Sequence, residues 1–171
     1  FSGDVLPVTP LGQALAIAER LEAIMAIFSI GKQPTGASDP YALRRSALGV
    51  IRVAIERHLP VDLESDLAFA SATFPESRNA KSVIPDVLEF FRERLKRYCL
   101  DRGYVTDEVE ATAASGFNRP ADFEKRLAAV SAFRKLEAAE SLEAANKRTR
   151  NILKKAEVTA TGSLREALLR E

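Results

Sequence analysis

Residues 31–55 read GKQPTGASDPYALRRSALGVIRVAI, a loop rich in glycine and proline that runs directly into one long apolar segment. Asp39 and Pro40 predict the start of a helix, because aspartate caps the free amides of a first turn and proline is tolerated at the first helical position. The apolar residues that follow recur at three- and four-residue spacing, which is the period of a helix with one buried face. They are Leu43, Ala47, Val50, Ile51, Ala54 and Ile55.

A first helix precedes this loop. Thr9 and Pro10 give a cap followed by a first-position proline, and Gly31 is a natural stop. We expect this helix and the helix of residues 40–58 to pack antiparallel, because a loop of about eight residues joins them. The expected core face of the first helix comprises Leu11, Leu15, Ala18, Leu21, Met25 and Phe28.

The remaining chain has the same helical period. Asp62 is a candidate cap for a short helix that runs to residue 74, and PESRNAK at 75–81 predicts an exposed loop. Three further helices are expected over residues 84–102, 106–116 and 120–133. Their expected core residues are Val87, Leu88, Phe91, Leu95 and Tyr98 in the first, and Phe123, Leu127, Val130 and Phe133 in the last.

A basic helix and a short terminal helix complete the prediction. The helix at about 138–156 has Leu142, Ala145, Ile152 and Leu153 as its expected core face. Ser163 and Glu166 form a capping box for the last helix, in which we expect Leu164 and Leu168 to be under-buried. No stretch alternates with the period of a strand, so the sequence predicts an all-α, bundle-like array of helices in two subregions, truncated at both ends.

The composition limits the classes of function. The chain has 171 residues, is 46% hydrophobic and 29% charged, and carries a net charge of +1, so any nucleic-acid site must be local. One cysteine excludes a disulfide framework and favours a reducing compartment, and no apolar run approaches the ~18 residues of a membrane span. We expect a cytoplasmic location. Because the chain starts with Phe1 rather than methionine, we expect a piece of a longer protein.

One charge run suggests nucleic-acid binding. Lys147, Arg148, Arg150, Lys154 and Lys155 place five cations in nine residues with no acid between them. On a helix these cations can contact phosphates, and Asn151 can reach a base edge or a 2′-hydroxyl. The alternative interpretation is a solvated helix face beside the acidic residues of 137–143.

A second set of cations lies at the loop. Arg44 and Arg45 can contact phosphates or anchor a neighbouring domain, and Lys32 is a further phosphate candidate. The alternative, which we favour for the arginines, is an ion pair that ties the loop to the helix through Asp39 or Glu56. The loop is not a phosphate-binding P-loop, because it lacks the spacing and the Gly-Lys-Ser/Thr ending of that motif.

The sequence offers no catalytic constellation. A His/Asp metal site needs several histidines, and His58 is the only one in the chain. We expect His58 at a helix end on the surface. Cys99 has no histidine near it in the sequence, and we expect a half-buried structural thiol. We therefore assign no catalytic residue and no metal or cofactor to this chain.

Four segments resemble one family in the same order. PTGASDPYALRRSALGVIR at 34–52 closely resembles the signature of the β subunit of bacterial heterotetrameric glycyl-tRNA synthetase. DVLEFFRERLKRYCLDRGY at 86–104, RPADFEKRLAAVSAF at 119–133 and AANKRTRNILKKAE at 144–157 are similar to later parts of that subunit. The resemblance implies three regions: the last helices of an HD-like region (1–60), a helical linker or body (61–140), and the start of an arginyl-type anticodon-binding domain (141–171).

The resemblance also implies a function. The parent α2β2 complex joins glycine to tRNA-Gly with ATP and releases AMP and diphosphate; the α subunit holds ATP, magnesium and the chemistry. The β subunit supplies most tRNA recognition. The implied partners are tRNA-Gly and the α subunit, with no membrane and no DNA. The alternative is a helical module that only bridges domains or contacts the α subunit, without touching RNA.

Overall fold

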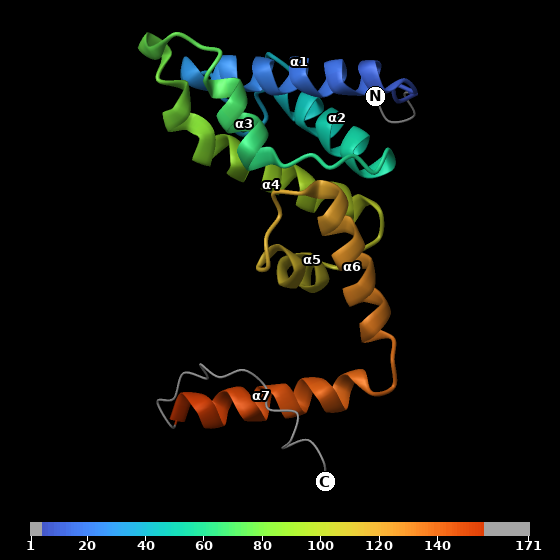
Figure 1. The fold of residues 1–171 in the computed structure, drawn as a ribbon. Helices are drawn as coiled ribbons and strands as arrows, with labels where there is room; N and C mark the ends of the chain where they lie inside the picture. The colour runs from blue at the N-terminus through green and yellow to red at the C-terminus, as the bar shows by residue number, and fades with distance from the viewer. Residues whose placement is uncertain (1–4, 156–171) are drawn as a thin grey trace, which may run out of the picture. The chain divides into compact units, whose positions relative to one another are not determined.

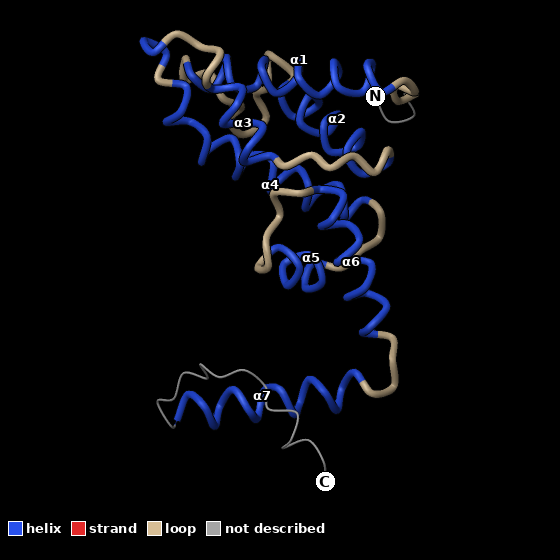
Figure 2. The backbone as a smooth tube through the Cα atoms, viewed as in Figure 1, coloured by secondary structure: helices blue, strands red, loops and turns tan. Residues whose placement is uncertain are grey.

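The computed structural model describes residues 5–155 and is built of helices joined by short loops (Figure 1; Figure 2). Over this range there are seven α-helices, two 3₁₀ segments and no strand, which confirms the all-α prediction. The elements are α1 Pro10–Ser29, α2 Leu43–Glu56, α3 Leu63–Ser71, η1 Glu76–Arg78, η2 Ala80–Val83, α4 Ile84–Asp101, α5 Thr106–Ala113, α6 Pro120–Arg134 and α7 Ala139–Lys155.

The chain divides into two compact units, Phe1–Ser131 and Ala132–Glu171. The first unit has one hydrophobic core to which every helix from α1 to α6 contributes. Its largest fully buried side chains include Phe91 of α4 and Phe123 of α6. The boundaries at residues 60 and 140 that the family resemblance implies stay predictions about a longer protein.

Helix α1 starts as predicted, but its first half lies outside the core. Thr9 caps it, with the Thr9 hydroxyl accepting the N–H of Gly12 at 3.1 Å, and Pro10 is the first helical residue. The buried face consists of Ile17, Leu21, Ile24, Met25 and Phe28. The prediction that Leu11 and Leu15 are buried is wrong, because these side chains are 79% and 66% exposed. Ala18, also predicted in the core, is exposed.

The loop before α2 is ordered, and the helix starts three residues later than predicted. Thr35 and Ser38 exchange two backbone hydrogen bonds of 3.1 and 2.8 Å around a turn at Gly36. Ala42 adopts a left-handed conformation with φ of 54°, which delays the helical path to Leu43. Pro40 is therefore not the first helical residue. Figure 1 shows α2 turning back against α1.

Helix α2 is the most buried helix of the first unit. All six residues predicted for its core face are buried, and Val53 joins them. Gly49 allows a close approach to α1, because a Cβ atom at this position would lie 2.8 Å from Nε of Arg20. The Arg20 guanidinium itself donates to the carbonyl of Ala16 at 2.7 Å.

The segment from α3 to α4 begins as predicted, but α3 ends at Ser71, three residues before the predicted end at residue 74. Asp62 caps α3, with its carboxylate accepting the N–H of Ser65 at 3.4 Å. Residues 75–81 are largely exposed, but they form short 3₁₀ turns rather than an irregular loop. Helix α4 buries four of the five predicted residues, and Leu88 is half-buried.

Helices α5 and α6 close the first unit. Helix α5 starts at Thr106 but ends at Ala113, three residues before the predicted end at residue 116. The Glu108 carboxylate accepts the N–H of Val105 at 3.5 Å. Pro120 starts α6 as predicted, with Phe123 and Leu127 buried and Val130 half-buried. The prediction that Phe133 faces a core is wrong, because it is 43% exposed.

The second unit contains α7, which matches the predicted helix to within a residue at each end. Its predicted core face is exposed, with Leu142 at 53% and Ile152 at 57%, and only Leu153 is half-buried. Ala145 is exposed as well. The capping box of Ser163 and Glu166, and the prediction for Leu164 and Leu168, lie outside the described residues.

Candidate nucleic-acid interface

The cations of α7 lie on the exposed second half of the helix. Every side chain of the predicted set is exposed: Lys147, Arg148, Arg150, Asn151, Lys154 and Lys155. Within residues 5–155 no carboxylate pairs with them. Lys154 and Lys155 lie in the last turn, where positive charge also offsets the negative end of the helix dipole.

The helix therefore separates its charges along its length. Glu140 and Glu143 occupy the first half, and the cations follow from residue 147 onward. Lys147, Arg150 and Lys154 are spaced by three and four residues, so they share one face of the helix. Three cations on one face span about 10 Å of helix axis, which suits contact with two or three successive phosphates.

Arg44 is engaged by its own loop. Its guanidinium donates to the carbonyl of Gly36 at 2.7 Å and reaches the carbonyl of Ser38 at 3.5 Å. These contacts join the loop to the helix, but they are hydrogen bonds to backbone carbonyls and not the predicted ion pair with Asp39 or Glu56. Glu56 is paired instead with Arg52, whose Nε lies 2.9 Å from Oε1.

The other two loop cations are on the surface. Arg45 is exposed on the first turn of α2, and Lys32 is exposed in the loop that follows α1. Both belong to the first unit together with Arg44, whereas the cations of α7 belong to the second. The predicted residues thus fall in two different units. A contact between either group and tRNA stays a prediction.

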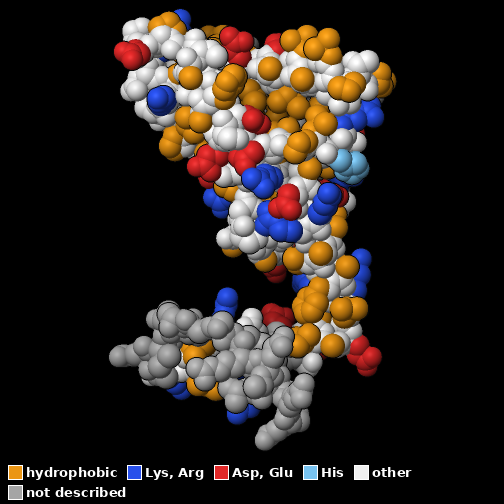
Figure 3. Space-filling model, in the orientation of Figure 1, with side chains coloured by type: hydrophobic (Ala, Val, Ile, Leu, Met, Phe, Trp, Pro, Cys, Tyr) orange, Lys and Arg blue, Asp and Glu red, His pale blue; other side chains and the backbone are white. Residues whose placement is uncertain are grey.

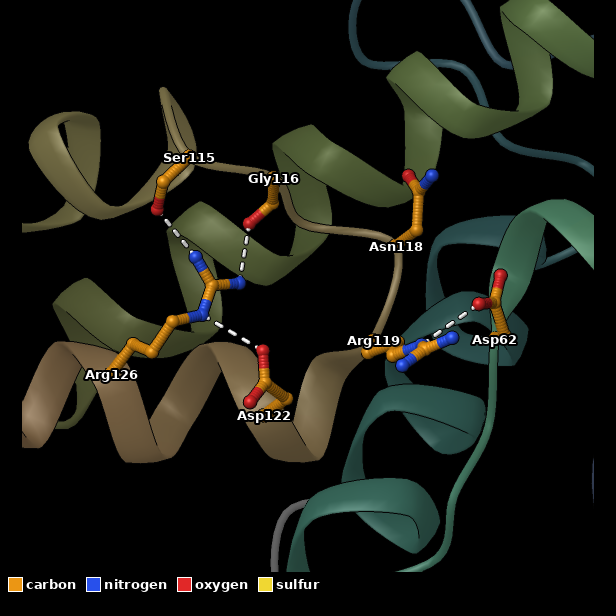
Figure 4. Close-up of a pocket in the computed structure, with 7 residues that line it drawn as sticks. All are labelled: Asp62, Ser115, Gly116, Asn118, Arg119, Asp122 and Arg126. Atoms are coloured by element: carbon orange, nitrogen blue, oxygen red, sulfur yellow. Dashed lines mark hydrogen bonds and ion pairs between the residues drawn. The ribbon is translucent and has the colours of Figure 1, made fainter. Parts of the chain in front are cut away.

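A polar cleft that the sequence did not indicate lies where the α5–α6 connection meets the start of α3 (Figure 4). Its volume is about 440 Å³, and its lining residues are Asp62, Ser115, Gly116, Asn118, Arg119, Asp122 and Arg126. Nε of Arg119 lies 2.9 Å from Oδ2 of Asp62, and this hydrogen bond lowers the pKa of the Asp62 carboxyl. The pair joins residues 57 positions apart, which helix periodicity cannot reveal.

Arg126 supplies the other half of the cleft. Its guanidinium contacts the Asp122 carboxylate at 2.8 Å, the Ser115 hydroxyl at 2.5 Å and the Gly116 carbonyl at 2.7 Å (Figure 4). The guanidinium groups of this cleft are thus bonded to acceptors of the protein itself. We therefore interpret the cleft as a structural contact and not as an anion site. Arg126 joins α6 to the end of α5, and Arg119 joins the α5–α6 connection to the start of α3.

The remaining titratable candidates have structural settings. His58 is exposed just after α2, as predicted. Cys99 is only 1% exposed, so it is buried rather than half-buried, and burial raises the pKa of its thiol to about 12. Among residues 5–155, no group of three or more His, Cys, Asp or Glu side chains is placed to hold a metal ion. No helix in that range is both long and apolar enough to span a membrane.

Comparison with known proteins places the chain in a family. A family model described as the glycyl-tRNA synthetase beta subunit matches residues 1–114. All 171 residues of this chain align with the glycine–tRNA ligase beta subunit of Shewanella halifaxensis, at 43% identity. This chain belongs to the glycyl-tRNA synthetase β-subunit family.

Other β subunits give the same result. The glycine–tRNA ligase beta subunit of Escherichia coli O157:H7 is 42% identical over 100% of this chain, and that of Haemophilus influenzae is 43% identical over 92%. The chain spans only 25% and 23% of these two relatives, about a quarter of a β subunit. The family model includes Lys32, Arg44 and Arg45, whereas α7 lies beyond it and is covered by the whole-chain relatives.

Proposed function

We propose that this chain is a helical, non-catalytic, tRNA-binding part of a glycyl-tRNA synthetase β subunit. The observation that carries the proposal is the exposed basic face of α7. The parent enzyme joins glycine to tRNA-Gly at the expense of ATP, and we assign that chemistry, with ATP and magnesium, to the α subunit in the cytoplasm. This chain contributes no catalytic residue and no cofactor to the reaction.

The basic face of α7 has the chemistry for a phosphate backbone. Arg150 offers a planar fork of donors that suits a phosphate, while Lys147 and Lys154 act as point charges on either side. Asn151 lies among these cations and can exchange hydrogen bonds with a base edge or a 2′-hydroxyl. Contacts of this kind fix the register of the RNA, and the amide adds a means of telling one nucleotide from another.

The role in the reaction is to position the tRNA. An RNA held by its backbone at several points loses the freedom to rotate away, so its acceptor end meets the active site more often in a productive orientation. The proposal therefore predicts an effect on tRNA affinity and on the transfer of glycine to tRNA. Formation of glycyl-adenylate, which needs no tRNA, is expected to stay unchanged when α7 is altered.

The decisive experiment is a salt titration of tRNA-Gly binding by the assembled α2β2 enzyme. In the test variant Lys147, Arg150 and Lys154 are changed to alanine, which removes three cations from one helix face. Affinity decreases with salt, and each phosphate contact contributes roughly 0.7–0.9 to the steepness of log affinity against log salt. We therefore expect the salt dependence of the test variant to be less steep by roughly 2–3.

The matched control removes three exposed cations elsewhere, by changing Arg78, Lys81 and Lys125 to alanine. This variant has the same net charge as the test variant, so it controls for long-range attraction between the protein and the RNA. We expect its slope and affinity to stay close to those of the unaltered enzyme. Equal slopes in the test and control variants would refute the assignment to α7.

A bridging or subunit-contacting role is the second candidate. It is favoured by one observation, the exposed apolar residues Leu11 and Leu15 on α1, which suit contact with protein and not with RNA. On this alternative, the α7 variant binds tRNA normally, and alterations of α1 reduce assembly of the enzyme. Sedimentation of the mixed subunits measures that assembly directly.

A further inference from the structure

The N-terminal half of α1 and the residues that lead into it expose an apolar surface. Val5, Val8, Leu11 and Leu15 are 89%, 73%, 79% and 66% exposed. We refer to these four residues as the α1 surface. Figure 3 shows hydrophobic side chains gathered over this end of α1, at the upper right of the view. Exposed apolar residues scattered singly are ordinary, but four within eleven positions are typical of an interaction site.

An apolar groove lies along the same half of the helix. Pro10, Ala14 and Ile17 of α1 form one wall, and Leu59, Pro60 and Val61 form the other, with a volume of about 280 Å³. Gln13 and Asp66 complete the lining, and Asp66 is its one charged member. Asp66 is half-buried there, and burial raises the pKa of its carboxyl.

The segment that precedes α1 is fixed in place. The side chain of Leu6 packs against the core, and the guanidinium of Arg57 donates to the Leu6 carbonyl at 3.2 Å. The amide of Gln13 donates to the Pro7 carbonyl at 3.1 Å. Both of these hydrogen bonds fix the two residues that lie between Val5 and Val8. The α1 surface is therefore preformed and does not need to be ordered when it is covered.

We propose that the α1 surface and its groove are covered by a further part of the β-subunit polypeptide, outside these 171 residues. The chain amounts to 25% of the length of relatives that match all of it, so about three-quarters of such a subunit remains to supply the cover. A segment of the same polypeptide acts at a high effective concentration, which favours it over a separate molecule.

The chemistry of the surface agrees with this occupant. RNA is disfavoured, because the α1 surface and the lining of the groove carry no cation and one carboxylate. Interfaces that form once and stay closed are more apolar than those that open and close, and all four residues of the α1 surface are apolar. We expect the covering segment to present apolar side chains to Leu11 and Leu15. The proposal rests on family membership and not on tRNA binding.

The test uses a full-length β subunit that carries this sequence, purified without its α subunit and studied at low concentration. Single cysteines are introduced as Leu11→Cys and Leu15→Cys, with Phe69→Cys as the control, since Phe69 on α3 is 78% exposed. The rate of maleimide labelling is measured for each. We expect the cysteines at 11 and 15 to be labelled at least tenfold more slowly than the one at 69.

Three outcomes would overturn the proposal. Labelling of all three cysteines at similar rates would show that the α1 surface is uncovered. Protection that appears only when the α subunit is added would make that subunit the occupant, and protection that disappears on dilution would indicate a second copy. Hydroxyl-radical footprinting of Leu11, Leu15 and Phe69 in the unaltered subunit repeats the test without substitutions. None of these measurements involves tRNA, so their failure is distinct from failure of the proposed function.

Discussion

Asp39 and Arg44 join the loop to the start of α2 by reciprocal hydrogen bonds. The Asp39 side chain, in the loop, bonds to the helix, and the Arg44 side chain, on the helix, bonds to the loop. The Asp39 carboxylate accepts the backbone N–H of Arg44 at 3.0 Å and that of Leu43 at 2.8 Å. The Arg44 side chain in turn donates to the carbonyl of Gly36 at 2.7 Å. The helix is thus capped from a distance, although the residue at the cap position, Ala42, has no side chain able to do so.

Changing Asp39 to alanine is expected to lower the free energy of unfolding by about 1–2 kcal/mol, as loss of a helix cap does. The backbone amides of Leu43 and Arg44, directly after the left-handed Ala42, would lose their acceptor. Urea denaturation followed by circular dichroism measures the change. Asp39→Asn, which keeps an acceptor oxygen, serves as the control and should cost clearly less. Equal stability of Asp39→Ala and the unaltered chain would contradict this account.

The sequence predicts the helices well because their signals are local. Thr9, Asp62 and Pro120 mark helix starts that the structure confirms, and periodicity identifies the buried face of α2. The predicted start of α2 at Pro40 is wrong because Ala42 adopts a left-handed conformation, so the helix can begin only at Leu43. A proline signal in the sequence cannot show that the residue two positions later leaves the helical region.

Periodicity fails where a helix extends beyond its neighbours. Leu11 and Leu15 of α1, and Leu142 and Ile152 of α7, have the spacing of core residues but no described element covers them. An apolar stripe shows that a helix can bury a face, and not what is present to bury it. The cleft at Asp62 and Arg119 could not be predicted either, because its pairing depends on the path of the chain through the three α-helices that separate these residues.

The ion pair in this cleft predicts a pH dependence. The hydrogen bond from Arg119 lowers the pKa of Asp62 below its ordinary 3.8, so folding favours the ionised carboxylate. The stabilisation is therefore present above about pH 3.8 and is lost as the pH falls through the lowered pKa. At pH 7 Asp62→Asn should cost about 0.2–1 kcal/mol, the range of an exposed pair. Urea denaturation from pH 7 to pH 3 should show a weaker acid dependence in the variant; an unchanged slope would contradict the pairing.

Asp66, one turn further along α3, should behave in the opposite sense. Burial raises the pKa of its carboxyl above 3.8, so folding disfavours the ionised form and stability falls as the pH rises through that range. Asp66→Asn removes the charge and keeps an oxygen for the N–H of Asp62, which Oδ2 accepts at 3.2 Å. We expect the variant to be as stable as the unaltered chain at pH 7, or more so. A clear loss of stability at pH 7 would show that the charge itself is needed.

Two phenylalanines allow a test of the core. Phe91 of α4 is fully buried, whereas Phe69 of α3 is 78% exposed. Phe91→Ala is expected to cost about 3–5 kcal/mol, because it removes buried apolar surface and leaves a cavity. Phe69→Ala should change stability by less than about 0.5 kcal/mol, which makes it the matched control. Thermal denaturation of both variants gives the comparison, and similar costs at the two positions would contradict the assignment of the core.

The contact between Gly49 and Arg20 predicts that two substitutions will not be additive. Alanine in place of a helical glycine usually stabilises by about 1 kcal/mol. At Gly49 the new Cβ atom would lie 2.8 Å from Nε and 3.1 Å from Cδ of Arg20, so the arginine must move away from the Ala16 carbonyl. We expect Gly49→Ala to stabilise the chain by about 1 kcal/mol only when Arg20 is also changed to alanine.

A double-mutant cycle measures this coupling. The four proteins are the unaltered chain, the two single variants and the double variant, each followed by urea denaturation under the same conditions. A coupling energy of at least about 0.5 kcal/mol is expected, since the two side chains share one space. If Gly49→Ala has the same effect with and without Arg20, then α1 and α2 adjust their separation freely. The glycine would then have no role in setting how closely these two helices approach.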